Sequence, residues 1–184
     1  MRNRNASRKF ISVAISLSLA TGLTTVTIGS ATAAQCQPVK ATGKSVGEIS
    51  VGSTSMVIKS FNYPAGGIME PQPTTTAAGL SARHMPLSSE VGTSVVVWHR
   101  DYNNCIHPLN VFANKDKGSK FEITDEKGVA KTYRVTKVGV ITKGDYKKSW
   151  FNLIGPRQIV MFSCTGVFKS GHYEKNLVVF AVPA

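Results

Sequence analysis

The chain has 184 residues, a formal net charge of +12, 42% hydrophobic residues and three cysteines. This length accommodates one domain and excludes a large multidomain enzyme. The apolar content is close to that of an average globular protein, which excludes wholesale disorder. Three cysteines without a CxxC pair or a Cys/His cluster exclude a disulfide-scaffold miniprotein and a structural zinc site.

The first 34 residues have the pattern of an export signal. Residues 1–9 carry four basic and no acidic side chains, and residues 10–39 carry no charge. The apolar stretch gives way to the small residues Ala31 to Ala34, which suit a signal peptidase. The uncharged run also reaches the roughly 20 residues that a membrane span needs. We therefore expect an exported protein that is cleaved near Ala34, with an uncleaved anchor over residues 1–34 as the alternative.

After a polar linker over residues 35–46, short β-prone runs alternate with turn signals. Segments rich in Val, Ile, Thr, Tyr and Phe predict seven strands, at residues 47–51, 55–61, 93–99, 120–124, 131–141, 158–164 and 176–182. Only short helical turns are expected, near residues 76–80 and 107–114. Many short strands separated by Gly and Pro in a domain of this size predict an all-β fold, either a closed barrel or a sandwich.

Two of these strands end in chemically reactive side chains. His99 ends the strand over residues 93–99, and Cys164 ends the strand over residues 158–164. A side chain at a strand end is held by rigid backbone and is still reachable from solvent. A cysteine beside a histidine can be deprotonated and can attack a carbonyl carbon. Each residue also has a structural explanation, Cys164 as an inert core thiol and His99 as a hydrogen-bonded strand-end histidine.

Five sequence blocks resemble, in order, those of the sortases, the cysteine transpeptidases of Gram-positive bacterial surfaces. They are Gly66 to Pro71, Val95 to Asp101, Lys131 to Val135, Ile159 to Gly166 and Ser170 to Ala181. The last block is similar to the closing strand of the actinobacterial class E/F sortases. The resemblance implies a closed sortase-like β-barrel of about eight strands with short helical turns, which forms a catalytic domain over residues 47–184.

The resemblance also implies a reaction. In sortases the cysteine attacks the Thr-Gly bond of an LPXTG-type sorting signal, a histidine protonates the leaving amine, and an amine of peptidoglycan or pilin resolves the thioester. Cys164 is then the nucleophile and His99 the general acid/base. The implied partners are an LPXTG-type surface protein or pilin and an amine acceptor of the cell wall. We expect a monomer without cofactor or metal, at the extracellular face of the membrane, in the cell wall or secreted.

The sequence departs from the family beside these two residues. Sortases carry an arginine on the last strand, but none of the seven arginines here lies beyond Cys164. One alignment places His172 at that position and another places Asn176 there, and neither has a guanidinium group. Trp98 and Ser163 replace the usual Gly and Thr. We expect four residues to contact the substrate: Trp98, Ser163, Lys175 and Asn176.

Alternatives remain open at this point. The missing arginine also fits a non-catalytic or degenerate sortase-like module, a cationic protein that binds the wall or assists pilus assembly. An L,D-transpeptidase is a second enzymatic alternative, although the residues around Cys164 lack its His-Gly-Cys-type signature. Scattered basic residues without aromatic interleaving argue against nucleic acid and favour a polyanionic surface such as a bacterial wall. Cys36 and Cys105 can form a disulfide in an oxidising exterior, which leaves Cys164 free.

Overall fold

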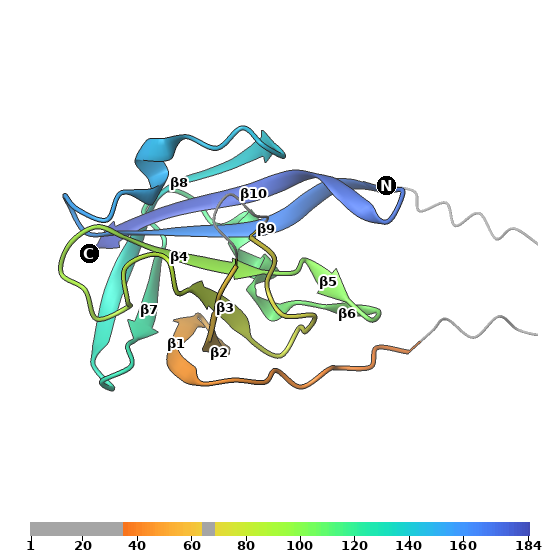
Figure 1. The fold of residues 1–184 in the computed structure, drawn as a ribbon, viewed down its shortest axis with the longest axis horizontal. Helices are drawn as coiled ribbons and strands as arrows, with labels where there is room; N and C mark the ends of the chain where they lie inside the picture. The colour runs from red at the N-terminus through yellow and green to blue at the C-terminus, as the bar shows by residue number, and fades with distance from the viewer. Residues whose placement is uncertain (1–34, 64–68) are drawn as a thin grey trace, which may run out of the picture. The chain divides into compact units, whose positions relative to one another are not determined.

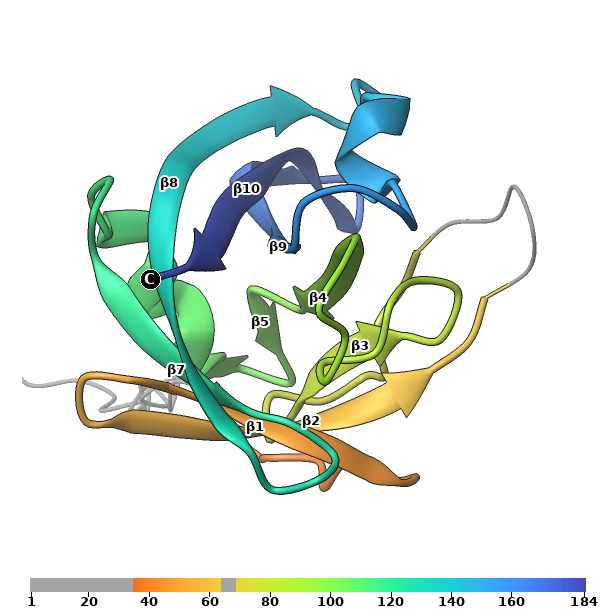
Figure 2. The ribbon, with the colours of Figure 1, turned by 90° about the vertical axis from the view of Figure 1, so that its left-hand side faces the viewer.

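Eight strands close into a barrel in the order β1-β2-β3-β4-β9-β10-β8-β7, and Figure 2 shows them arranged around a ring. The bounds of these strands are β1 (Ser45–Val51), β2 (Thr54–Phe61), β3 (Ala78–Ser81), β4 (Thr93–Trp98), β7 (Lys120–Thr124), β8 (Ala130–Thr142), β9 (Gln158–Lys169) and β10 (His172–Pro183). The small hairpin of β5 (Asp101–Tyr102) and β6 (Cys105–Ile106) follows β4, and two 3-10 helices, η1 (Pro108–Asn114) and η2 (Lys148–Phe151), lie in connections. The prediction of a closed all-β barrel of about eight strands with short helical turns is confirmed.

This computed structural model describes residues 35–63 and 69–184. The expected export signal over residues 1–34 and the start of the block from Gly66 to Pro71 lie outside the described residues. In the part of the chain that is described, no helix is long and apolar enough to cross a membrane.

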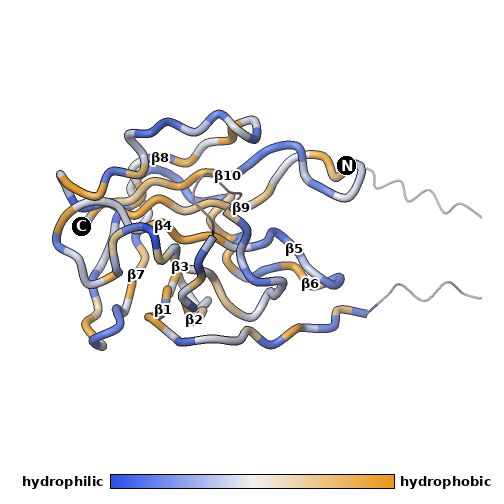
Figure 3. The backbone as a smooth tube through the Cα atoms, in the orientation of Figure 1, coloured by the Kyte–Doolittle hydropathy of each residue, from blue (hydrophilic) through white to orange (hydrophobic). Residues whose placement is uncertain are grey.

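Strands β4, β9 and β10 are covered on both faces. Side chains alternate between the two faces of a strand. Trp98, Met161 and Val179 belong to a core cluster to which all eight barrel strands contribute, so they lie inside the barrel. Val97 and Phe162 belong to a second cluster on the outer face, packed against aromatic residues of η2. Burial on both faces explains why these strands read as nearly continuous apolar runs, visible as orange segments in Figure 3.

The structure corrects one predicted element and lengthens others. The sequence predicts a helical turn over residues 76–80, but Ala78–Ser81 form β3, which pairs in parallel with β2 and antiparallel with β4. Such a short segment becomes a strand through pairing with its neighbours rather than through its own propensity. Strands β9 and β10 extend beyond the predicted ends and meet at a two-residue turn. Its residues, Ser170 and Gly171, both have positive φ angles of 51° and 82°, as a type I′ turn requires.

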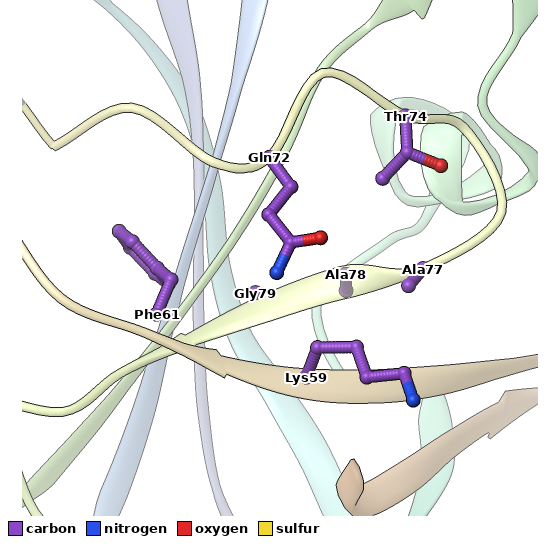
Figure 4. A pocket seen from close by; sticks show the side chains of 7 residues that line it. All are labelled: Lys59, Phe61, Gln72, Thr74, Ala77, Ala78 and Gly79. Atoms are coloured by element: carbon purple, nitrogen blue, oxygen red, sulfur yellow. The ribbon is translucent and has the colours of Figure 1, made fainter. Parts of the chain in front are cut away.

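The segment over residues 35–44, expected as a linker, runs along the barrel in an extended form (Figure 1). Asn103 Nδ2 donates a hydrogen bond of 2.9 Å to the Gln37 carbonyl, and the Gln72 side chain bonds both the amide and the carbonyl of Thr42. Beside this segment lies a cavity of about 10 Å3 between Gln72 and strands β2 and β3 (Figure 4). That volume holds about one water molecule, which excludes a ligand site there.

Candidate active site

Three neighbouring strands bring His99, Cys164 and Asn176 into one row. Trp98 of β4 pairs with Ser163 of β9, so the next residues, His99 and Cys164, are neighbours. Asn176 of β10 pairs directly with Cys164 from the other side. By alternation all three side chains lie on the outer face of the barrel, the face that also carries Phe162. The outer apolar cluster is therefore bordered at this end of the strands by three polar side chains.

This row opens into a cavity of about 580 Å3, within the roughly 300–1,000 Å3 typical of small-ligand sites. Its described wall comes from residues 69–71, the end of β4, the β5–β6 hairpin, the β8–β9 connection and the β9–β10 hairpin. Six of the residues predicted for the site line it: Trp98, His99, Ser163, Cys164, His172 and Asn176. Lys175 is not among the described lining residues, and its Nζ lies 3.9 Å from Glu174 Oε1.

Cys164 carries a free, half-buried thiol. Burial raises the pKa of this thiol, because desolvation disfavours the thiolate. The positive charge of Lys143 acts in the opposite direction, whereas the negative charges of Asp101 and Glu70 add to the rise. The resting cysteine is therefore a neutral thiol at neutral pH, and it needs a base and nearby positive charge to act as a nucleophile.

His99 is oriented by a backbone carbonyl. Its Nε2 lies 3.2 Å from the carbonyl oxygen of Pro71, and its ring lies 5.8 Å from that of Tyr102 between centroids. Because a carbonyl oxygen can only accept, Nε2 carries the proton in this hydrogen bond. The neutral ring then has an unprotonated Nδ1, which is the nitrogen available as a base.

Asn176 is buried and bonds to a residue that sequence reasoning missed. Its Nδ2 donates a hydrogen bond to the hydroxyl oxygen of Tyr146, in the connection between β8 and β9. The pKa of Tyr146 is raised by burial first and then by negative charge on Cys164, and the bond from Asn176 acts against this rise. Lys143, from the same connection, also lines the cavity. The sequence signal for this connection was three aromatic residues, Tyr146, Trp150 and Phe151, within a polar stretch.

Trp98 and Ser163 lie behind the row. The Trp98 side chain is buried in the barrel, where Nε1 donates a 3.1 Å hydrogen bond to Asn110 Oδ1 and the ring packs against His107 and Phe112. Ser163 alternates with Cys164 and so faces the barrel interior, where its Oγ is buried without a hydrogen-bond partner among the described residues. Both residues line the cavity, but the indole ring of Trp98 packs in the barrel core.

The two sequence candidates for the position of the family arginine lie in different places. Asn176 faces Cys164. His172 begins β10 at the tip of the hairpin, is exposed, and has its Nδ1 3.2 Å from the Ser170 carbonyl. Four residues along a strand correspond to about 13 Å, so His172 lies at the rim of the cavity.

A disulfide joins Cys36 to Cys105 across 69 positions of the chain. Cys105 belongs to the β5–β6 hairpin, whose residues Asp101 and Tyr102 form part of the cavity wall. The disulfide thus ties the N-terminal segment to one wall of the site, and it leaves Cys164 as the one unpaired cysteine of the three.

The closed barrel, with a free cysteine and a histidine at neighbouring positions of adjacent strands, fits a cysteine-dependent enzyme. The Sortase domain family matches residues 51–184, so the chain belongs to the sortase family. The expected membership of the sortase family is confirmed, and the finer assignment to class E/F stays a prediction. No curated protein matches the chain.

Solved structures of sortases share the fold. Sortase A from Corynebacterium diphtheriae has a TM-score of 0.59 and 17% identity, over 79% of this chain and 63% of that chain. A pilus-related sortase C of Group B Streptococcus has a TM-score of 0.60 and 19% identity, over 78% of this chain and 69% of that chain. The complex of Streptococcus agalactiae sortase C1 and MTSET has a TM-score of 0.59 and 15% identity, over 76% of this chain and 69% of that chain. This chain therefore spans a little less than two thirds of the length of that sortase A.

Proposed function

We propose that this protein is a cysteine transpeptidase that cleaves an LPXTG-type sorting signal and transfers the acyl part to an amine of peptidoglycan or pilin. The observation that carries the proposal is the position of Cys164, the one unpaired cysteine, between His99 and Asn176 in the wall of a substrate-sized cavity. The sequence of the closing strand, Ser170 to Ala181, favours a place among the class E/F sortases. The expected site of action is the extracellular face of the membrane, the cell wall or the surrounding medium.

The chemistry follows from the two reactive groups. Cys164 gives its proton to Nδ1 of His99, and Sγ attacks the carbonyl carbon of the Thr-Gly bond while the carbonyl π pair moves onto oxygen. Collapse of this intermediate returns the electron pair, breaks the C–N bond and leaves a thioester on Cys164. The imidazolium of His99 supplies the proton to the departing amine. An acceptor amine then attacks the thioester and restores the thiol.

The cavity offers apolar and polar surface for such a peptide. Phe162 and Met69 provide apolar contacts for the Leu and Pro side chains of the signal, and Asn176 offers a polar one. Lys175 and His172 lie nearer the exposed hairpin and would contact residues farther along the substrate. The third catalytic role, stabilisation of the oxyanion, has two candidates from the sequence, Asn176 facing Cys164 and His172 at the rim.

The test is detection of the acyl intermediate. The purified protein is incubated with a panel of LPXTG-type peptides, and mass spectrometry measures a thioester adduct on Cys164. We expect an adduct that is absent in Cys164→Ala, strongly reduced in His99→Gln, and consumed when a glycine peptide or an amine is added. No adduct with any peptide, in a protein shown to be folded, would contradict the proposal.

A second function is favoured by two observations: no arginine lies beyond Cys164, and burial raises the pKa of the Cys164 thiol. Both features fit a module that binds the sorting signal or the wall without efficient turnover. Peptide binding measured by calorimetry, with the same affinity in wild type and Cys164→Ala and no adduct in either, would support this module and exclude the transpeptidase.

A further inference from the structure

Three polar side chains share the cavity wall with Cys164 and come from the side of β9 that is away from His99. Asn176 pairs with Cys164 across β9 and β10. Tyr146 accepts a hydrogen bond from Asn176. Lys143 directly follows β8, whose residue Ile141 pairs with Asn176. Asn176, Tyr146 and Lys143 all line the same cavity as Cys164.

We infer that Tyr146 is a catalytic residue of this site, donating a hydrogen bond to the oxyanion formed at Cys164, with Lys143 supplying positive charge and Asn176 positioning the phenol. This inference rests on the proposed function, because it assigns a role in that reaction. It differs from the expectations drawn from the sequence, which considered only residues of the last strand for this role.

The direction of the hydrogen bond supports the role of Tyr146. A phenol can donate one hydrogen bond and accept others. Asn176 Nδ2–H donates to the Tyr146 oxygen, so the phenol's own proton is available to a different acceptor. No described residue accepts it. Asn176, which holds the Tyr146 hydroxyl, pairs directly with Cys164, and both Tyr146 and Cys164 line the cavity. The pKa of Tyr146 is raised mainly by burial, and negative charge on Cys164 adds to the rise.

Charge explains the need for Lys143. The carboxylates of Asp101 and Glu70 oppose a negative charge at Cys164, and Lys143 is the cation that favours it. When Sγ adds to the carbonyl carbon, the π pair moves to the carbonyl oxygen, so one negative charge passes from sulfur to oxygen. A donor and a cation in the same cavity wall as Cys164 stabilise the thiolate before attack and the oxyanion after it.

The connection that carries Tyr146 is anchored well enough to hold it. Tyr146 packs edge-on against Phe162 with ring centroids 5.6 Å apart, and Phe151 and Trp150 of the same connection pack against Phe162 and Phe180. These contacts attach the connection to the outer apolar cluster directly beside the row of His99, Cys164 and Asn176. The phenol is therefore held by packing on one side and by Asn176 at its hydroxyl.

The experiment has two readouts, and the first needs no peptide. Since Cys36 and Cys105 are joined in a disulfide, iodoacetamide reports on Cys164 alone in the unreduced protein. We expect Lys143→Gln to slow alkylation at pH 7.5 about fivefold, the upper range for one exposed charge, and Tyr146→Phe to slow it by a similar factor. Lys143→Arg should keep the wild-type rate. Lys147→Gln and Tyr63→Phe, which lie outside the cavity wall, serve as matched controls with unchanged rates.

The second readout is turnover of the peptide. Removing one oxyanion donor costs about 10²-fold or more in kcat, so Tyr146→Phe should lose at least that factor while KM changes little. Asn176→Ala should lose a similar factor, because the phenol is no longer positioned. Wild-type kcat in Tyr146→Phe overturns the inference and leaves the transpeptidase standing. A 10²-fold loss in His172→Ala with none in Tyr146→Phe assigns the role to His172 and also overturns it.

The two proposals fail separately. If no peptide gives an adduct, the transpeptidase is wrong, and alkylation still measures whether Lys143 and Tyr146 stabilise negative charge at Cys164. Wild-type alkylation rates in both Lys143→Gln and Tyr146→Phe overturn the inference whatever the peptides show. Circular dichroism and thermal unfolding of each variant confirm that the fold is retained.

Discussion

The hydroxyl of Tyr173 donates a hydrogen bond to the carboxylate of Asp101, which lies 72 positions earlier in the chain. The guanidinium of Arg100 lies 5.0 Å from the centre of the same tyrosine ring. Asp101 follows His99 by two residues, and Tyr173 lies in the hairpin that follows Cys164. One polar contact thus joins the segment that follows His99 to β10, the strand that pairs with the strand of Cys164, and both of its residues line the cavity.

Replacing Tyr173 by Phe tests this contact. The variant loses the hydroxyl but keeps the ring beneath Arg100, so we expect a KM for the sorting peptide several-fold higher with little change in kcat. Asp101→Asn keeps a hydrogen-bond acceptor and removes a negative charge that raises the pKa of Cys164, so its thiol should be alkylated faster than that of wild type. Steady-state kinetics and iodoacetamide rates measure both, and an unchanged KM in Tyr173→Phe would show that the contact is dispensable.

Much of the barrel could be predicted because its strands carry their own signals. The strands β4, β7, β8 and β9 are apolar or alternating runs between turn residues, and their positions followed from composition. Strand β3 could not be predicted in this way, since it consists of only four residues whose conformation depends on pairing with β2 and β4. Its partners are distant in sequence or follow a loop, and no local pattern encodes that pairing.

The candidate site also contains residues that the local sequence predicts and residues that depend on tertiary packing. Cys164 and His99 could be predicted because each ends an apolar strand, whereas Tyr146 and Lys143 lie in a connection whose path depends on packing against the outer cluster. The choice between His172 and Asn176 depended on register. Between Phe168 and Thr165 the β9 strand contains one more residue than β10 does between Tyr173 and Lys175. This bulge sets Asn176 opposite Cys164, and a sequence does not show on which strand such a residue falls.

Gly166 is the residue that makes the bulge possible. Its φ angle is +87°, and a Cβ at this position would lie 3.1 Å from Glu174 Cγ. We expect Gly166→Ala to cost about 1 kcal/mol of unfolding free energy for the left-handed backbone, and to slow acylation because a shift in register turns Asn176 away from Cys164. Gly128→Ala is the matched control, with a φ of +79° and open space around its Cβ. Equal acylation rates in the two variants, at equal loss of stability, would rule out a role for the bulge.

The disulfide should contribute strongly to stability. Its loop of 69 positions corresponds to about 4 kcal/mol in the chain-entropy model. We expect Cys36→Ser to lower the free energy of unfolding by a few kcal/mol and Cys105→Ser to do so by a similar amount. The double variant should lose no more than either single one, because both remove the same cross-link. Urea unfolding measures this, and additive losses would mean that the two side chains act independently.

His107 gives the fold a dependence on pH. The ring is fully buried, with Nε2 3.1 Å from the Ala77 carbonyl and Nδ1 accepting from the amide of Leu109 at the start of η1. Burial lowers the pKa of His107 from 6.5 to about 4, against an opposing effect of the bond to Ala77, and positive charge on His99 adds to the decrease. The unfolded chain therefore binds more protons than the folded one between pH 6.5 and 4.

The neutral His107 ring should thus contribute its full share of the free energy of unfolding above pH 6.5. This contribution should decrease as the pH falls from 6.5 to 4, by about 3 kcal/mol in total. Burial also lowers the pKa of His84, so wild type carries contributions from both residues. We expect His107→Gln to be less stable at neutral pH and to show a shallower fall of the urea midpoint between pH 7 and 4.5, with the contribution of His84 remaining. The slope of the urea midpoint against pH reports protonation, whereas the midpoint at neutral pH also reports lost packing. Identical slopes in the variant and wild type would contradict the assignment of this pH dependence to His107.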